Sequence, residues 1–356
     1  MPSLAKRIVQ SWASRGLLAW TLRPLGALMG LLVCLRRMAY QTGLLQAQSP
    51  GLPVVVVGNR VVGGAGKTPT TIAIVQHLQN QGWRPGVLSR GYRRAKSASQ
   101  STLIDTNSAP GLNAADVGDE PLLIWRRTQA PAMVGPDRVA AGRSLRQQHP
   151  DVNILVCDDG LQHLRLERQV EIVVFDERGA GNGWLLPAGP LREPIAPPPP
   201  RSLVAAPIVL YNAAAVSTPL AGYLGRRSMS PLKTLVQWWS GLPYEAGQAP
   251  PRQGAWAIAG ISHPPKFFDQ LRAMGFDCHA VARGDHDPYT TLPWPEGVAH
   301  VIVTEKDAVK LSPERLSRER PGTQVWVAAL DFNPEVGFWR AFDAALARLQ
   351  TSPPNT

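Results

Sequence analysis

The chain has 356 residues, of which 44% are hydrophobic and 18% are charged. At about 150 residues per domain this length predicts two domains, and the composition excludes an intrinsically disordered chain. The three cysteines form no CxxC pair, which argues against a disulfide framework and a cysteine zinc site and favours a reducing compartment.

The net charge of +11 is concentrated at the start of the sequence. The first acidic residue is Asp105, and the 104 residues before it contain 13 of the 37 lysines and arginines. The rest of the chain has 24 basic and 26 acidic residues, a net charge of −2. We therefore expect an acidic partner at this end, for which an anionic membrane and a nucleic acid both qualify.

Residues 1–48 interleave leucines with basic side chains. Their longest uncharged run, residues 24–35, has 12 residues, whereas a membrane-spanning helix needs about 20. We find no signal-peptide cleavage pattern. This pattern predicts a basic amphipathic segment on an anionic membrane surface and makes nucleic acid the less favoured partner. A helix pair packed on the protein's own core is the alternative. The interleaved basic residues are Arg15, Arg23, Arg36 and Arg37.

From residue 53 onward, short apolar runs alternate with helix-length stretches. This βαβ progression predicts an α/β fold of the P-loop NTPase type, with a doubly wound, mainly parallel sheet. A proline-rich stretch at 194–200 divides the runs, so we expect a nucleotide-binding domain at 49–200 and a smaller α/β lobe at 201–356. The last helix, 336–349, could pack on either. Strands are expected near 54–57, 86–89, 132–134, 154–157, 172–175, 204–210, 255–259, 301–304 and 325–329, and helices at 70–81 and 138–148.

A glycine-rich loop follows the first expected strand and precedes the first expected helix. Its glycines let backbone amides face phosphate groups, Lys67 supplies a positive charge, and the Thr68 hydroxyl can bind Mg²⁺. A glycine turn with an incidental Lys-Thr pair is the alternative. The loop resembles that of the ParA and MinD nucleotide switches, although Val62 replaces their lysine. A membrane-recruited ATPase switch that binds a protein partner is thus the rival function. The predicted nucleotide ligands are Gly63, Gly64, Ala65, Gly66, Lys67 and Thr68.

Two aspartates end the apolar run 154–157. In parallel α/β sheets ligands bind at the carboxyl ends of strands, so Asp158 and Asp159 are expected to meet Mg²⁺ and phosphates beside Lys67. The alternative is a pair of acids that caps a turn.

Motifs along most of the chain resemble those of the tetraacyldisaccharide 4′-kinases of lipid A biosynthesis. The resemblance implies transfer of the γ-phosphoryl of ATP, with Mg²⁺, to the 4′-hydroxyl of an acylated glucosamine disaccharide 1-phosphate. It also implies a place on the cytoplasmic face of the inner membrane, without a nucleic acid or an obligate protein partner. Ala65 and residues 261–263 depart from the family pattern. The matching segments are 58–59, 62–69 (VGGAGKTP), 88–92 (LSRGY), 117–121 (VGDEP), 158–163 (DDGLQH), 186–192 (LPAGPLR) and 303–307 (VTEKD).

The resemblance also assigns roles to two acidic residues and a histidine. Asp119 is expected to be the base or orienting group for the sugar hydroxyl, Glu120 to support Mg²⁺, and His286 to form a dyad with Asp119. As alternatives, the two acids could complement a helix dipole, and His286 could be a solvated loop residue.

Arginines are suited to phosphate because they offer a rigid fork of donors. Arg138 and Arg192 are expected to neutralise phosphate, with surface charge as the alternative. Arg90, Arg93 and Arg94 could meet either the substrate's phosphate or lipid headgroups. The segment 304–307 (TEKD) does not fit the guanine-reading motif, and it could touch adenine or the hinge between lobes.

Overall fold

The computed structural model describes residues 4–91, 101–109, 112–242 and 248–351. Contacts divide the chain into two units. The first unit comprises Met1–Arg90, Asp137–Arg226 and Phe332–Thr356, and the second comprises Gly91–Pro136 and Arg227–Asp331. The chain thus crosses between the units four times, and the expected boundary near residue 200 does not coincide with this division. The predicted α/β fold class is confirmed.

The first unit is built on a parallel sheet with the order β8-β7-β6-β1-β5-β2. The four strands β1, β2, β5 and β6 are buried along their whole length, as expected for Val- and Ile-rich strands covered on both faces. The strands are β1 (Val54–Gly58), β2 (Pro85–Ser89), β5 (Ile154–Asp158), β6 (Val170–Asp176), β7 (Ile208–Asn212) and β8 (Tyr223–Met229).

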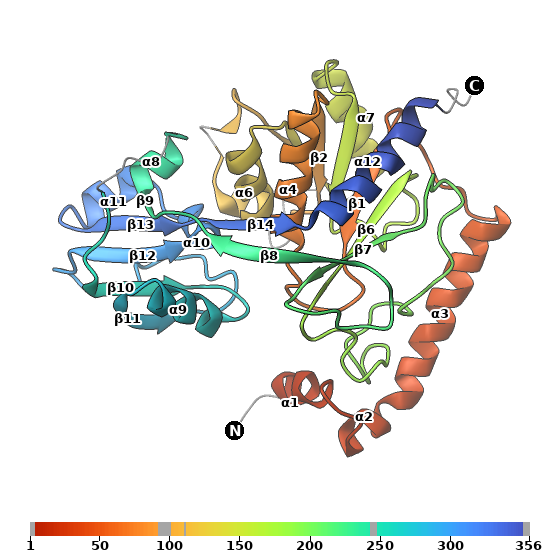
Figure 1. Cartoon of the computed structure of the whole chain (residues 1–356), viewed down its shortest axis with the longest axis horizontal. Helices are drawn as coiled ribbons and strands as arrows, with labels where there is room; N and C mark the ends of the chain where they lie inside the picture. Colours follow the sequence, from red (N-terminus) through yellow and green to blue (C-terminus); the bar gives the residue numbers. More distant parts are fainter. Residues whose placement is uncertain (1–3, 92–100, 110–111, 243–247, 352–356) are drawn as a thin grey trace. The chain divides into compact units, whose positions relative to one another are not determined.

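Helices α4 (Lys67–Asn80), α7 (Arg138–Gln148) and α12 (Val336–Thr351) belong to the first unit (Figure 1). His77 of α4 stacks on Trp339 of α12 with 4.1 Å between ring centroids, and its Nε2 lies 2.7 Å from Asp343 Oδ1. These contacts fix the C-terminal helix to α4 of the first unit.

The N-terminal part of the first unit consists of α1 (Leu4–Ser11), α2 (Leu17–Thr21) and α3 (Arg23–Thr42). Within the described residues, none of the helices is both long and apolar enough to span a bilayer.

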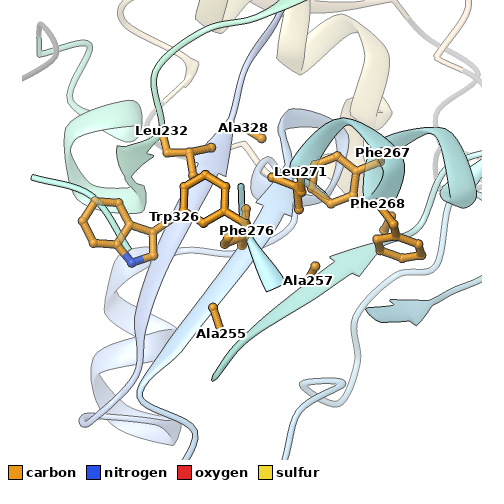
Figure 2. Packing of buried hydrophobic residues seen from close by; sticks show 11 residues of the cluster. Leu232, Ala255, Ala257, Phe267, Phe268, Leu271, Phe276, Trp326 and Ala328 are labelled. Atoms are coloured by element: carbon orange, nitrogen blue, oxygen red, sulfur yellow. The ribbon is translucent and has the colours of Figure 1, made fainter. Parts of the chain in front are cut away.

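The second unit contains a five-stranded sheet in the order β11-β10-β12-β13-β9, parallel except for β9. Phe267, Phe268 and Leu271 of α9 (Pro264–Ala273) pack in one core with the small side chains of β10 (Figure 2). The alanines of β10 leave room for the two phenyl rings, which keeps the layer close-packed. The strands are β9 (Lys233–Thr234), β10 (Gln253–Ala259), β11 (Asp277–Ala282), β12 (His300–Thr304) and β13 (Gln324–Ala328).

Short elements complete the second unit. β4 (Ala132–Val134), expected among the parallel strands, pairs antiparallel with β3 (Thr102–Ile104). Strands β8 and β14 (Leu330–Pro334) each carry the chain across the boundary between units. The helices are α5 (Ala114–Val117), α6 (Asp119–Thr128), α8 (Leu235–Trp239), α10 (Glu305–Ala308) and α11 (Pro313–Glu319).

Candidate functional site

The glycine-rich loop joins β1 to the first turn of α4, as the sequence predicts. Gly66 caps α4 with a φ of 90°, a left-handed conformation that favours glycine. Asn212 at the end of β7 donates from Nδ2 to the Ala65 carbonyl oxygen at 3.1 Å, which holds the loop against the sheet. The loop therefore leads into a helix N-terminus that begins with Lys67 and Thr68, a suitable place for an anion.

Lys67 lies beside the end of the neighbouring strand β5. Its Nζ is 3.8 Å from Asp159 Oδ1 and donates to Asn59 Oδ1 at 3.4 Å. Asp158 is buried, and its Oδ1 accepts a hydrogen bond of 2.9 Å from the Thr71 hydroxyl of α4. The structure thus brings the predicted lysine and both predicted aspartates to the same edge of the sheet.

The donor set at this edge fits a magnesium ion that is shared with a nucleotide. Mg²⁺ is typically held by one or two carboxylates together with substrate phosphates, rather than by a protein cage. The described residues contain no cluster of three His, Cys, Asp or Glu side chains that could hold a metal. The Thr68 hydroxyl and the carboxylates of Asp158 and Asp159 would therefore act with phosphate oxygens.

The two predicted phosphate-binding arginines lie in different surroundings. Arg192 Nη1 lies 3.1 Å from Asp159 Oδ1, at the edge that carries Lys67. Arg138, at the start of α7, is only 4% exposed, which excludes a simple surface charge. Burial raises the pKa of Cys157 to about 11, although the positive charge of Arg138 opposes this shift. Burial also lowers the pKa of His163 to about 4, an effect that Arg138 reinforces.

Asp119 and His286 form a hydrogen-bonded pair in the second unit. Asp119 is the first residue of α6 and is 6% exposed, and its Oδ2 lies 2.7 Å from Nδ1 of His286. His286 has a φ of 61°, a left-handed conformation that non-glycine residues rarely adopt. Such conformations persist where the surrounding structure holds them, often at functional sites. The structure thus forms the expected pair.

The surroundings of Asp119 favour its ionised form. Burial by itself raises the pKa of this carboxyl, but the hydrogen bond and charge of His286, together with Lys306 and Lys310, outweigh burial and lower the pKa below its ordinary value. Lys310 Nζ lies 3.8 Å from Asp119 Oδ2. Asp119 is therefore a carboxylate at neutral pH, and Lys310 is a neighbour that we did not predict.

The segment 304–307 supports this pair from within the second unit. Lys306 Nζ donates to Glu120 Oε1 at 2.6 Å, so the predicted metal-supporting carboxylate has a lysine partner. Burial lowers the pKa of Lys306, but the charge and hydrogen bond of Glu120, together with the charges of Asp119 and Asp285, outweigh burial and raise this pKa overall. Asp307 is fully buried, and its Oδ2 accepts from the Gly260 amide and the Thr304 hydroxyl. The motif thus ties α6 to the ends of β10 and β12.

A cavity of about 750 Å³ lies beside Asp119 and His286 within the second unit. Trp125 and Trp239 form part of its lining, and the Arg126 guanidinium lies 3.9 Å above the Trp239 ring centroid. Cavities of this size accommodate small organic groups. Of the other predicted basic residues, Arg90 is exposed, whereas Arg93 and Arg94 lie outside the described residues, as does Tyr92 in the same motif.

Comparison with known proteins gives consistent results. The profile of the family described as tetraacyldisaccharide-1-P 4′-kinase matches residues 18–347. A tetraacyldisaccharide 4′-kinase from Methylibium petroleiphilum is 52% identical over 344 residues, covering 96% of this chain and 94% of the relative. One from Leptothrix cholodnii is 52% identical over 346 residues, with 96% of each chain covered.

A solved structure shares the fold. It is LpxK from Aquifex aeolicus in complex with ATP, with a TM-score of 0.75 and 22% sequence identity, covering 94% of this chain and 99% of that one. The fold, the profile match over most of the chain and the relatives at 52% identity lead to one conclusion: the chain belongs to the tetraacyldisaccharide-1-P 4′-kinase family.

Proposed function

We propose that this protein transfers the γ-phosphoryl group of ATP to the 4′-hydroxyl of a tetraacylated glucosamine disaccharide 1-phosphate, a precursor of lipid A. The observation that carries the proposal is the presence, in a chain of this family, of both parts that such a kinase needs. The first unit has a phosphate loop with paired aspartates, and the second has a carboxylate–histidine pair. A nucleotide switch requires the first part only.

The first unit is proposed to hold ATP and its metal. Backbone amides of Gly63, Gly64, Ala65 and Gly66 would face the phosphates, and Lys67 would neutralise the β- and γ-phosphate oxygens. Bound Mg²⁺, held by Thr68 with Asp158 or Asp159, would offset the negative charge that develops during transfer. The contact of 3.8 Å between Lys67 Nζ and Asp159 Oδ1 supports this assignment, because it places positive and negative ligands at one strand end.

The second unit is proposed to hold the acceptor hydroxyl. His286 bonds to Oδ2 of Asp119, so we assign Oδ1 to the 4′-hydroxyl, which it would orient and relieve of its proton. The transition state of phosphoryl transfer is loose in most analyses, and catalysis depends mainly on positioning and electrostatics. A carboxylate of lowered pKa is adequate for this task. The cavity beside the pair would accept part of the sugar.

The remaining charged residues receive supporting roles. Arg192 is proposed to stabilise transferring phosphate, because its guanidinium lies at the strand end with Asp159. We retain phosphate neutralisation as the proposed role of Arg138. Glu120 is proposed to support Mg²⁺ in the nucleotide-bound enzyme, which requires that it exchange or share its bond with Lys306.

The N-terminal helices are proposed to hold the protein on the anionic cytoplasmic surface of the inner membrane. The side chains of Leu25, Leu28, Leu31, Leu32 and Leu35 are each more than half exposed on α3. The opposite face of this helix carries glycines and packs on the segment that contains Leu185 and Ala188. A Cβ on Gly26 would lie 3.0 Å from the Leu185 carbonyl oxygen and 3.2 Å from the Ala188 Cβ. Helix α3 is thus held by its small residues, while its leucines remain available to lipid.

The test is an incubation of the protein with γ-labelled ATP, Mg²⁺ and the acyl disaccharide 1-phosphate in mixed micelles. We expect label in the lipid, one phosphate per ATP consumed, and loss of this label with the Lys67→Ala variant. ATP hydrolysis that continues without lipid labelling would support the nucleotide switch instead.

A further inference from the structure

Arg37 of α3 is buried, whereas the other arginines of the N-terminal segment, Arg7, Arg15, Arg23 and Arg36, are exposed. The exposed fraction of Arg37 is 8%. Arg37 donates from Nη2 and Nε to Glu193 Oε2 at 2.5 and 3.2 Å, and from Nη1 to the Pro198 carbonyl oxygen at 2.9 Å. The sequence pattern placed Arg37 among the basic residues expected to face a membrane. Because it is buried, Arg37 is not one of them.

Glu193 connects this arginine to Gln162. The carboxylate is only 3% exposed, and its second oxygen, Oε1, accepts from Gln162 Nε2 at 3.0 Å. Gln162 Nε2 also donates to the Asn59 carbonyl oxygen at 3.2 Å. The carboxylate thus fixes which end of the Gln162 amide carries the donor, and Gln162 Oε1 is turned toward Arg192 Nη1 at 3.4 Å.

Two of the three contacts of Gln162, those with Asn59 and Arg192, lead to Lys67. On one side, the side chain of Asn59 accepts from Lys67 Nζ. On the other side, Arg192 bonds to Asp159, whose Oδ1 lies 3.8 Å from Lys67 Nζ. A continuous set of polar contacts therefore runs from α3 to the phosphate loop inside the first unit. Hydrogen-bonded side-chain networks orient and polarise their members, and the end of this network that contains Arg37 and Glu193 is buried.

We propose that Arg37 is a positioning residue for phosphoryl transfer: through Glu193 and Gln162 it holds Arg192, Asp159 and Lys67 in the arrangement that the transferring phosphate requires. Helix α3 is then a structural support of the proposed phosphate-binding site as well as the proposed membrane contact. Without Arg37, Glu193 becomes a buried carboxylate that has lost its closest cation. Arg60 is the next one, with its Nε 4.0 Å from Glu193 Oε1. A turn of Glu193 toward Arg60 would release the Gln162 amide.

The test compares Arg37→Met with Arg36→Met at saturating ATP and lipid, and it rests on the proposed function because it reads lipid phosphorylation. Both variants remove one charge from the same helix, but only the first breaks the buried network. Loss of an outer partner of ligating groups typically costs about 10- to 100-fold in activity. We expect kcat of Arg37→Met to fall below that of Arg36→Met by at least about tenfold, with partial recovery in Arg37→Lys.

Two further measurements separate positioning from folding and from the proposed function. The stoichiometry of ATP binding gives the folded fraction of each variant, so that kcat can be expressed per folded molecule. If Arg37 served only to stabilise the fold, this corrected kcat would be the same in Arg37→Met as in the wild type. If Arg37→Met does not fold, Glu193→Gln keeps the shape without the charge and is expected to reduce kcat. Equal kcat in Arg37→Met and Arg36→Met, or full kcat in Glu193→Gln, would overturn the proposal. A wild-type protein without lipid phosphorylation would instead refute the proposed function.

Discussion

The pair of Asp119 and His286 allows a double-mutant test with a magnitude set by its geometry. The bond between Asp119 Oδ2 and His286 Nδ1 is 2.7 Å long and lies in a mostly buried setting. A hydrogen bond to a charged group contributes about 1.5–3 kcal/mol. At 1.36 kcal/mol per tenfold in rate, its complete loss in the transition state corresponds to about 10- to 160-fold in kcat. This range is the expected upper limit for His286→Ala, because only interactions that strengthen in the transition state affect kcat.

Asp119→Ala is expected to lower kcat further than His286→Ala, since it removes the group that we propose to meet the acceptor hydroxyl. General-base assistance contributes about 10²- to 10⁴-fold. If His286 acts only through Asp119, the double variant should be no slower than Asp119→Ala, because groups that work as a unit are not additive.

Single-turnover transfer of phosphate to the lipid, at saturating ATP, is the appropriate assay. Calorimetric titration with ATP should give an almost unchanged Kd for all three variants. His279→Ala, at an exposed histidine of β11 in the same unit, serves as the control and should retain full activity. Fully additive losses in the double variant would refute the dyad and leave Asp119 with another role, such as metal support.

Three other predictions concern the phosphate loop, the membrane face and pH. Lys67→Ala should lower turnover by about 10²- to 10³-fold, as is usual for a lost charge-stabilising donor, at an unchanged Tm; near-normal turnover would disprove the loop assignment. Burial of a leucine side chain contributes about 1.5–3 kcal/mol, so joint replacement of Leu28 and Leu32 by Ser should weaken binding to anionic vesicles in a sedimentation assay by at least about tenfold. The control Val336→Ser, on α12, should leave this binding unchanged. Equal sedimentation of the two variants would place the membrane contact elsewhere. The pKa of Asp119 is lower in the folded protein than its ordinary value. As the pH falls from about 5, the unfolded chain therefore binds more protons than the folded protein, and the free energy of unfolding declines. In urea titrations Asp119→Asn should show a smaller decline over this range, and an identical pH dependence would contradict the lowered pKa.

Strands with continuous apolar runs were predictable from the sequence, and strands without them were not. The run at 54–57 corresponds to β1, and the run at 154–157 to β5, because both strands are buried on two faces. Strand β11 is mostly exposed and β8 contains two arginines, so neither has a pattern that marks it. The proline-rich stretch suggested a boundary near residue 200, but residues 91–136 belong to the second unit by long-range contacts.

The gathering of Lys67, Asp158 and Asp159 at one edge of the sheet was predictable, because these residues belong to compact motifs at strand ends. Lys67 and Asp159 occur at positions where parallel strands place their ligands. The supporting residues were not predictable, because their partners are distant in the sequence. The charge pattern does not distinguish Arg36 from Arg37, and the partners of the buried Arg37 are distant in the sequence: Glu193 lies 156 residues beyond it and Pro198 lies 161 residues beyond it. Lys310 approaches Asp119 in the same way, through tertiary structure alone.

The most direct test of the proposed kinase activity is the position of the transferred phosphate on the lipid. The protein would be incubated with ATP, Mg²⁺ and two acceptors, the tetraacylated disaccharide 1-phosphate and its 4′-deoxy analogue, and the lipid products would be analysed by mass spectrometry and phosphorus NMR. One added phosphate, on the 4′-oxygen, is expected with the first acceptor and none with the second. Phosphate gained by the 4′-deoxy analogue, or ATP consumed without any phosphorylated lipid, would contradict the proposed activity.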